Sequence, residues 1–405
     1  KCSHYIFEYI KANPSNLAKF KFLLSFPELV SFEIRSSYFR NKMISRIKNN
    51  STLHLDINRD RILSSSFYQL NKKTKDELLQ KIRVSFDNEG GIDAGGLKRQ
   101  WFVDLSKELF NPNYGLFSCS GRNTSYRPNS LSYINSNHLD YFKFAGKFIA
   151  RSLIESQCIE AHFATSFIKQ ILHRVPELDD LEEIEEDIYS SLKYMLNNDV
   201  DDLEMFFAID KNELGIVKTI PLIENGENIP VTNENKNEYI ELRANYSFQG
   251  IIEEQIKAFS EGFDSLISHD EIKFFTPNEF DLLICGIPEI DVVDFQNNIV
   301  FERPYNKDTP VVKMFFNVIS EWDSEKLAKL LLFMTGSSRV SSNGFKEFCE
   351  ITGRKLTIAP GGKRSNLPQA HTCYNMICLP EYQSEEELNE KLLIAIQNSN
   401  TFEFA

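Results

Sequence analysis

Cys373 is the residue whose surroundings point most clearly to chemistry. It lies thirty-two residues before the end of the chain, in the stretch Leu367-Pro-Gln-Ala-His-Thr-Cys-Tyr-Asn. A proline followed by hydrogen-bonding residues in a short extended run can present a thiol at a strand end, where its thiolate would act as a nucleophile. Free cysteine is also among the most buried residue types, so a purely structural role stays open.

A cysteine hydrolase would need a histidine that takes the proton of this thiol. That histidine must lie within hydrogen-bond reach of the sulfur and be oriented by a third residue. No histidine follows Cys373 in the chain. His371 lies two residues before it, so on a strand the two side chains share a face and run parallel instead of converging. A papain-like arrangement, with its histidine far downstream, is therefore excluded.

Thioester exchange is a less demanding reaction for the same thiol. When a thiolate attacks a thioester, another thiolate leaves, so the step is nearly balanced and needs no strong base. An amine can then attack the new thioester. An exposed cysteine on a small mobile lobe, joined by a hinge to a larger docking lobe, suits such a relay.

The sequence after about residue 280 predicts both a small lobe and a hinge before it. The helix ending at Cys285 meets Gly286-Ile287-Pro288, a joint because glycine terminates helices and proline resists continuing them. After it we expect helices over 308–322 and 324–334, strands over 355–359 and 370–377, and a helix over 384–398. Ser384 and Glu387 form a capping-box start for that last helix. We place a boundary near 286–290, which leaves a lobe of normal domain size.

The region before the joint reads as mainly helical. Residues 1–50 predict helices broken at Asn13-Pro14 and Phe26-Pro27. A strand over 81–86 leads into a glycine-rich turn over 89–96 and a helix over 97–110, and two further helices are expected over 137–157 and 161–173. The turn is no phosphate loop, because Leu97 stands where the phosphate-binding lysine belongs and Asp93 would repel phosphate.

An apolar stripe and an acidic run occur together between 177 and 192. Leu181, Ile184, Ile188 and Leu192 have the spacing of one helix face, which is normally core. Residues 177–187 hold eight carboxylates in eleven positions. Such a run is usually a solvated face, but it can also attract a basic protein, and an exposed stripe beside it would make a docking groove.

The composition of the chain limits the classes of function that it can have. The chain has 405 residues, 42% of them hydrophobic and 25% charged, and its net charge is −13. Residues 1–50 are basic, with nine Lys/Arg and three Asp/Glu, so the remainder is an acidic body, which disfavours nucleic-acid binding. No run of eighteen apolar residues predicts a membrane span. We expect the sequence to be a fragment without a signal peptide, since no basic-then-apolar leader is present. Seven cysteines without a C-x-x-C pair favour the cytosol or nucleus and disfavour a zinc site.

Several motifs in order resemble the HECT-type E3 ubiquitin ligases. The C-terminal signature is Leu367-Pro-x-Ala-His-Thr-Cys373-Tyr-Asn, followed by Leu379-Pro-x-Tyr-x-Ser384. Upstream, matching patterns occur at Glu89-x-Gly-Ile-Asp-Ala-Gly-Gly96, Asn111-Pro-x-Tyr114, Tyr141-Phe-Lys-Phe144, Val231-Thr-x-Glu-Asn-Lys236 and Thr335-Gly-Ser-Ser-Arg-Val340. The resemblance covers about 52–405, and phrases such as Tyr38-Phe39-Arg40 are similar to the large Tom/Huwe-like branch.

The resemblance implies a bilobal α+β fold. It assigns 1–51 to a helical extension, 52–286 to a large N-lobe that binds the E2, 287–289 to the hinge and 290–405 to a small α/β C-lobe. It also implies ubiquitin transfer from a charged E2 through a thioester on Cys373 to substrate lysines, with no metal or small-molecule cofactor.

The family pattern also suggests roles for individual residues. His371 and Thr372 would shape and polarise the site, and Phe402 matches the tail phenylalanine implicated in the second transfer. The positions that line the E2 groove are matched by Ile188, Ser191, Leu192 and Tyr239.

The sequence departs from the family pattern at three places. Ser341 replaces a usual proline and Gln100 a common glutamate, and both changes look structural. Ile377-Cys378 stands where Leu-Asp is frequent, which removes a carboxylate near the site and leaves open how an incoming lysine is oriented. Cys378 itself would be packed on an alternating strand. The rival hypothesis is a non-catalytic module that binds E2 or ubiquitin, against which an intact Cys373 and Phe402 count.

Overall fold

The computed structural model describes residues 2–87, 96–120, 125–159, 161–213, 215–287 and 289–397, and for Cys373 it describes the backbone. Residues 89–95 of the glycine-rich turn, Pro288 and Phe402 lie outside the described residues. The chain packs into two compact units, one formed by 1–109, 147–161 and 263–405, the other by 110–146 and 162–262. The predicted boundary at 286–290 falls inside the first unit, so the division into an N-lobe and a C-lobe stays a prediction.

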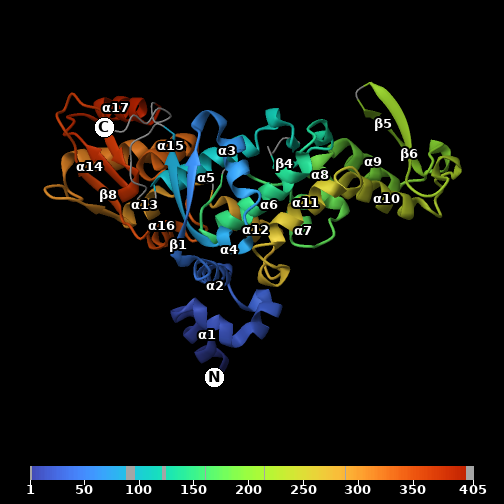
Figure 1. The fold of residues 1–405 in the computed structure, drawn as a ribbon, viewed down its shortest axis with the longest axis horizontal. Helices are drawn as coiled ribbons and strands as arrows, with labels where there is room; N and C mark the ends of the chain where they lie inside the picture. Colours follow the sequence, from blue (N-terminus) through green and yellow to red (C-terminus); the bar gives the residue numbers. More distant parts are fainter. Residues whose placement is uncertain are drawn as a thin grey trace. The chain divides into compact units, whose positions relative to one another are not determined.

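The first unit begins with the predicted N-terminal helices and a small parallel sheet (Figure 1). Its elements before the joint are α1 (Cys2–Ala12), 3-10 segments at Pro14–Ser25 and Pro27–Leu29, α2 (Phe32–Ile44), β1 (Lys48–Ile57), α3 (Ile62–Leu70), α4 (Lys75–Leu78), β2 (Gln80–Phe86), α5 (Gly96–Leu109) and α12 (Pro277–Cys285). The expected breaks at Pro14 and Pro27 are confirmed, and β2 pairs in parallel with β1, a strand that the sequence analysis did not predict.

The part of this unit after the joint has its own layered structure. Its elements are α13 (Val292–Asn297), β7 (Ile299–Phe301), α14 (Pro310–Ser320), α15 (Ser324–Thr335), α16 (Gly344–Thr352), β8 (Leu356–Pro360), β9 (Gln369–His371), β10 (Met376–Leu379) and α17 (Glu385–Gln397). The strands form one sheet in the order β7-β8-β10-β9, with only β9 antiparallel. A hydrophobic cluster runs from Phe295 to Ile396 and draws only on residues after the joint, as a separate lobe would.

The second unit is mainly helical with two small hairpins. Its elements are β3 (Phe117–Ser120), β4 (Ser125–Pro128), α7 (Thr165–Ile171), α8 (Leu181–Ile184), α9 (Glu186–Asn197), β5 (Ala208–Glu213), β6 (Ile216–Pro221), α10 (Lys236–Asn245) and a π-helical turn at Tyr246–Gly250. The helices α6 (His138–Ile154) and α11 (Glu253–Asp264) run from this unit into the first. The β5–β6 hairpin projects beyond α9 and α10 (Figure 1).

Two predicted elements are wrong in detail. The expected strand over 370–377 is two antiparallel strands, β9 and β10, separated by a 3-10 turn at Thr372–Tyr374. The expected helix face over 181–192 belongs to two helices, because the backbone breaks at Glu185, whose φ is −147°. The carboxylate of Glu185 accepts a hydrogen bond from the Ser247 hydroxyl at 2.6 Å. Among the described residues, none of the helices combines the length and the apolar character needed to cross a membrane.

Candidate functional site

Cys373 is the central residue of the 3-10 turn that joins β9 to β10. The turn closes when the Asn375 backbone N–H donates to the Thr372 carbonyl at 3.2 Å. Asn375 is fully buried and adopts the left-handed conformation (φ 51°), which asparagine tolerates better than most residues. Its side-chain amide donates to Thr352 Oγ1 at 3.0 Å and to the Arg354 carbonyl at 3.3 Å. The structure therefore places Cys373 at a chain reversal and not along the predicted strand.

The other residues expected around Cys373 lie on both sides of this turn. His371 ends β9 and is exposed, while Thr372 is half-buried. Because the strand ends at His371, this residue and Cys373 do not share a strand face, and the expected parallel geometry is wrong. Cys378 follows on β10 and is only half-buried, where burial raises the pKa of its thiol. A raised pKa leaves Cys378 less thiolate, so it is a weaker nucleophile near neutral pH.

Arg99 is a residue beside the turn that the sequence analysis missed. It lies near the start of α5, is 6% exposed, and its Nη2 donates to the Thr372 carbonyl at 2.5 Å. The signal available in the sequence was a basic residue three positions after the glycine-rich turn. A charge at that position gives no indication of a partner 273 residues away. The turn that carries Cys373 is thus held from α5 as well as from its own sheet.

The joint before this region is packed against the following chain. Gly286 ends α12 with a φ of 72°, and a Cβ there would lie 2.3 Å from the Val340 carbonyl oxygen and 2.8 Å from Cys158 Sγ. The Ile287 N–H donates to that same carbonyl at 2.9 Å. Glycine is required both by the backbone conformation and by the lack of space. The predicted joint is therefore a glycine corner bridged to Val340.

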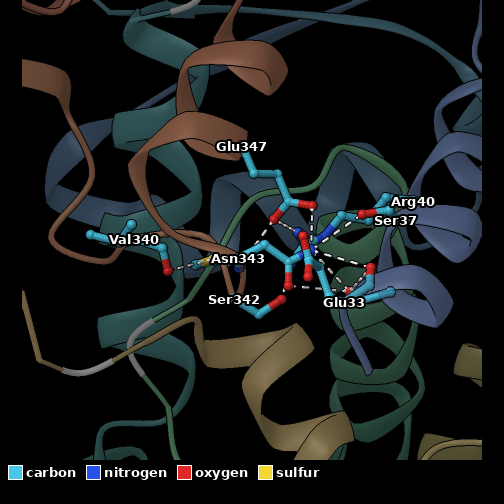
Figure 2. A network of polar contacts seen from close by, with 9 residues as sticks. Glu33, Ser37, Arg40, Val340, Ser342, Asn343 and Glu347 are labelled. Atoms are coloured by element: carbon cyan, nitrogen blue, oxygen red, sulfur yellow. Dashed lines mark hydrogen bonds and ion pairs between the residues drawn. The ribbon is translucent and has the colours of Figure 1, made fainter. Parts of the chain in front are cut away.

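A polar network ties α2 to the loop and first turn of α16 (Figure 2). Arg40, 5% exposed, forms an ion pair with Glu347 and donates to the Ser342 hydroxyl at 2.6 Å. The Asn343 amide donates to Ser36 Oγ at 3.1 Å and Ser37 Oγ at 3.2 Å. Burial lowers the pKa of Arg40 to about 10, so the group stays charged at neutral pH. A buried charge of this kind must keep its partners, so α2 holds the segment around α16 in place.

The four residues expected to line an E2 groove differ in how deeply their side chains are buried. Leu192 on α9 is 2% exposed and Tyr239 on α10 is 4% exposed, and the Tyr239 ring packs edge-on against Phe207 at 5.6 Å between centroids. Ile188 is half-buried, and Ser191 is exposed with its hydroxyl donating to the Asp187 carbonyl at 2.8 Å. The structure thus places the first two in packing positions and the last two at the surface.

Exposed apolar side chains in the same unit were missed because they lie off the buried stripe. Tyr194 is 56% exposed and stands three residues after Ser191 on α9, so the two are neighbours on the helix surface. Leu203 and Phe206, in the segment after α9, are also exposed. Exposed apolar groups that gather in one patch are typical of a protein–protein contact, and these three residues come from α9 and the segment that follows it.

The acidic run is partly neutralised by lysines. Lys169 pairs with Asp180 at 2.7 Å and with Glu177 at 3.3 Å, and Lys193 pairs with Asp179 at 2.6 Å. Lys193 lowers the pKa of the exposed Asp179 carboxyl through a hydrogen bond and its charge. Glu182, Glu186 and Asp187 remain exposed beside α9. The run is thus a solvated surface that keeps a local negative charge.

Comparison with known proteins identifies similar sequences. A family model described as HECT-domain (ubiquitin-transferase) matches residues 103–405. "E3 ubiquitin-protein ligase TOM1-like" of Neurospora crassa is 38% identical over 98% of this chain, which spans 10% of that relative. "E3 ubiquitin-protein ligase RSP5" of Chaetomium thermophilum is 39% identical over 92% of this chain and 46% of the relative. "E3 ubiquitin-protein ligase TOM1" of Saccharomyces cerevisiae is 36% identical over 96% of this chain and 12% of the relative. The chain therefore spans a tenth to a half of the length of these relatives.

Proposed function

The chain belongs to the HECT-domain (ubiquitin-transferase) family, and we propose that it is the catalytic part of an E3 ubiquitin ligase that carries ubiquitin as a thioester on Cys373. One observation carries this assignment: the family match includes the 3-10 turn Thr372–Tyr374 between two strands, and Cys373 is the central residue of that turn.

The proposed chemistry consists of two acyl transfers. The Cys373 thiolate attacks the carbonyl carbon of the ubiquitin–E2 thioester, a new C–S bond forms, and the E2 thiolate leaves. A neutral lysine amine then attacks the carbonyl carbon on Cys373, the C–N bond forms, and the Cys373 thiolate leaves while the amine loses its proton to solvent. Neither step requires the histidine that a hydrolase would need.

Thioester trapping tests this proposal. We expect that incubation with E1, charged E2 and ubiquitin gives an adduct of the chain that persists on non-reducing gels and disappears with thiol. The adduct should be lost in Cys373→Ala and retained in Cys378→Ala. The rival hypothesis, a non-catalytic module that binds E2 or ubiquitin, predicts binding without any adduct for a panel of charged E2 enzymes.

We also propose that the E2 docks on the surface of α9, at Ile188, Ser191 and Tyr194. Support comes from the exposed apolar ring of Tyr194 and the exposed carboxylates beside it, which suit an E2 with a basic, partly apolar face. Leu192 and Tyr239 then support this surface from within, so Leu192→Asp would disturb packing as well as docking.

Tyr194→Ala tests the docking surface without touching the core. We expect Cys373 loading at subsaturating E2 to fall about tenfold, since aromatic anchors contribute roughly 1–2 kcal/mol or more to an interface. Tyr68→Ala is the matched control, because Tyr68 on α3 is 78% exposed and lies in the other unit. Equal loading by both variants would refute the docking assignment.

The remaining proposals follow from the family and the composition. We propose protein lysines as acceptors and ubiquitin-charged E2 as donor. The described cysteines Cys119, Cys158, Cys285, Cys349 and Cys378 are free thiols, which supports a reducing compartment such as the cytosol or nucleus. Phe402 and Pro288, outside the described residues, keep their predicted roles in lysine modification and in the hinge.

A further inference from the structure

The backbone just before Cys373 is bound by two different parts of the first unit. The Thr372 carbonyl oxygen accepts the Asn375 N–H at 3.2 Å from within the turn and Arg99 Nη2 at 2.5 Å from α5. Arg99 belongs to a fourteen-residue helix whose inner face is buried, so its own position is rigid. The carbonyl is therefore fixed to an element that lies before the joint at Gly286.

The end of α15 brings a third segment to the same place. Gly336 terminates that helix in the left-handed conformation (φ 75°), and a Cβ there would lie 3.7 Å from the Gly96 carbonyl oxygen, 3.8 Å from Arg99 Cβ and 3.9 Å from Thr372 Cβ. The start of α5 and the turn thus both lie within 4 Å of the position that a Cβ on Gly336, at the end of α15, would take. This close approach is what allows the Arg99 side chain to reach the turn.

We propose that Arg99 is a positioning residue for the second transfer, in which ubiquitin passes from Cys373 to a lysine. The inference rests on the proposed function. Attack by an amine requires the thioester carbonyl to be held within about 3–3.5 Å of the nucleophile in a defined orientation. A turn fixed only to its own sheet would move with the segment after the joint, whereas the Arg99 bond fixes it to α5 as well.

The first transfer depends much less on this bond. In the proposed loading step the E2 supplies the thioester, so the E2 and not α5 sets how the reacting carbonyl approaches Cys373. During discharge the E2 has left. The hydrogen bond from Arg99 on α5 then holds the turn to the part of the chain that precedes the joint. Loss of Arg99 should therefore slow the second transfer more than the first, although in this proposal Arg99 touches neither ubiquitin nor lysine.

The guanidinium group fits this task better than an ammonium group would. Its planar fork gives directional donors, and a hydrogen bond from a charged donor to a carbonyl is stronger than a neutral one. A lysine at this position would keep the charge but lose the fork. We therefore expect Arg99→Lys to retain part of the function and Arg99→Gln to lose more of it.

A single-turnover chase separates the two steps. The full chain is loaded from charged E2, ATP is removed to stop recharging, and free lysine is added while the decay of the thioester is followed on non-reducing gels. We expect Arg99→Gln to load within about twofold of wild type and to discharge about 10- to 100-fold more slowly, the size of effect that slight misplacement causes. Arg99→Gln should lower the discharge rate at saturating lysine and leave the lysine concentration for half-maximal rate unchanged. Arg99→Lys should discharge at a rate between those of wild type and Arg99→Gln.

Arg35→Gln is the matched control for a general loss of stability. Arg35 on α2 is 5% exposed and its Nη1 donates to the Phe274 carbonyl at 2.9 Å, and its described partners Val30, Phe274 and Glu279 are not part of the turn. It should lower the melting temperature without a selective effect on discharge. Hydrogen exchange of the amides over 372–378, measured without E2, should be faster in Arg99→Gln than in Arg35→Gln.

Three outcomes would overturn the inference. The first is discharge at the wild-type rate in Arg99→Gln, and the second is equal slowing of loading and discharge. The third is a selective discharge defect in Arg35→Gln as well. A wild-type chain that forms no adduct at all would instead refute the ligase proposal, and this inference would fall with it.

Discussion

At the scale of single residues, Asn375 decides the shape of the turn that carries Cys373. Its φ of 51° and its side-chain bonds to Thr352 and Arg354 are separate contributions that substitution can distinguish. Glycine keeps the left-handed conformation but loses the amide, and alanine loses both. The turn thus depends on one buried asparagine that no strand pattern would single out.

We expect stability to fall in the order wild type, Asn375→Gly, Asn375→Ala. Loss of the buried hydrogen bonds should cost about 1–3 kcal/mol, and the left-handed backbone should cost alanine roughly 1 kcal/mol more. Urea unfolding measures both differences. An Asn375→Ala chain as stable as Asn375→Gly would mean that backbone strain does not contribute at this position.

Glu271 gives a pH-dependent contribution to stability. Burial alone would raise its pKa, but hydrogen bonds from Lys42 and Arg46 outweigh burial and lower the pKa to about 2. A carboxyl with a depressed folded-state pKa stabilises the fold above its unfolded value of 4.5, and that stability is lost as the pH falls from about 4.5 to about 2. Glu271→Gln should therefore unfold more easily at pH 7 and lose less stability between pH 5 and pH 3.

Asp270→Asn is the control for Glu271. Asp270 is an exposed neighbour paired with Lys273 at 2.6 Å, and exposed ion pairs contribute little. Urea midpoints across this pH range should separate the two variants. Identical pH profiles for Glu271→Gln and wild type would show that the buried ion pair does not drive acid unfolding.

At the scale of elements, the end of α12 is a corner fixed in place by packing. Gly286→Ala places a Cβ against the Val340 carbonyl in a strained backbone, so we expect a loss of at least about 2 kcal/mol. Gly353→Ala, with a φ of 64° and open space around its Cβ, isolates the backbone cost of roughly 1 kcal/mol. Equal losses in urea unfolding would mean that the contact with Val340 is soft.

Sequence patterns predicted the elements whose ends are marked by local signals. The glycine after Cys285 marks the end of α12, and α14, α15 and α17 lie within a few residues of their expected ends. The short helices α13 and α16 after the joint were not predicted. The break at Glu185 and the turn at Thr372–Tyr374 were not predicted, because tertiary contacts of Glu185 and Asn375 determine them. A prediction from periodicity alone therefore continued one helix across Glu185 and one strand across Thr372–Tyr374.

At the scale of the whole molecule, the motif order predicted the family, while the contacts of single side chains needed coordinates. Arg99 and Thr372 lie 273 residues apart, and Arg40 and Ser342 lie 302 apart. No local pattern links such pairs, because charge and hydropathy in the sequence do not specify a distant partner. The burial of Leu192 and the exposure of Tyr194 on one helix likewise depend on which face packs.

We propose that Cys373, and no other thiol of this chain, carries ubiquitin. Peptide mapping by mass spectrometry of the chain after reaction with charged E2 tests it most directly. Cys378, only five residues away, serves as an internal control. We predict a thiol-sensitive ubiquitin remnant on Cys373 and none on Cys378, and a Cys373→Ser chain that gives a thiol-resistant ester at the same position. A remnant on any other cysteine, or no remnant with a panel of charged E2 enzymes, would refute the role of Cys373 as the carrier thiol.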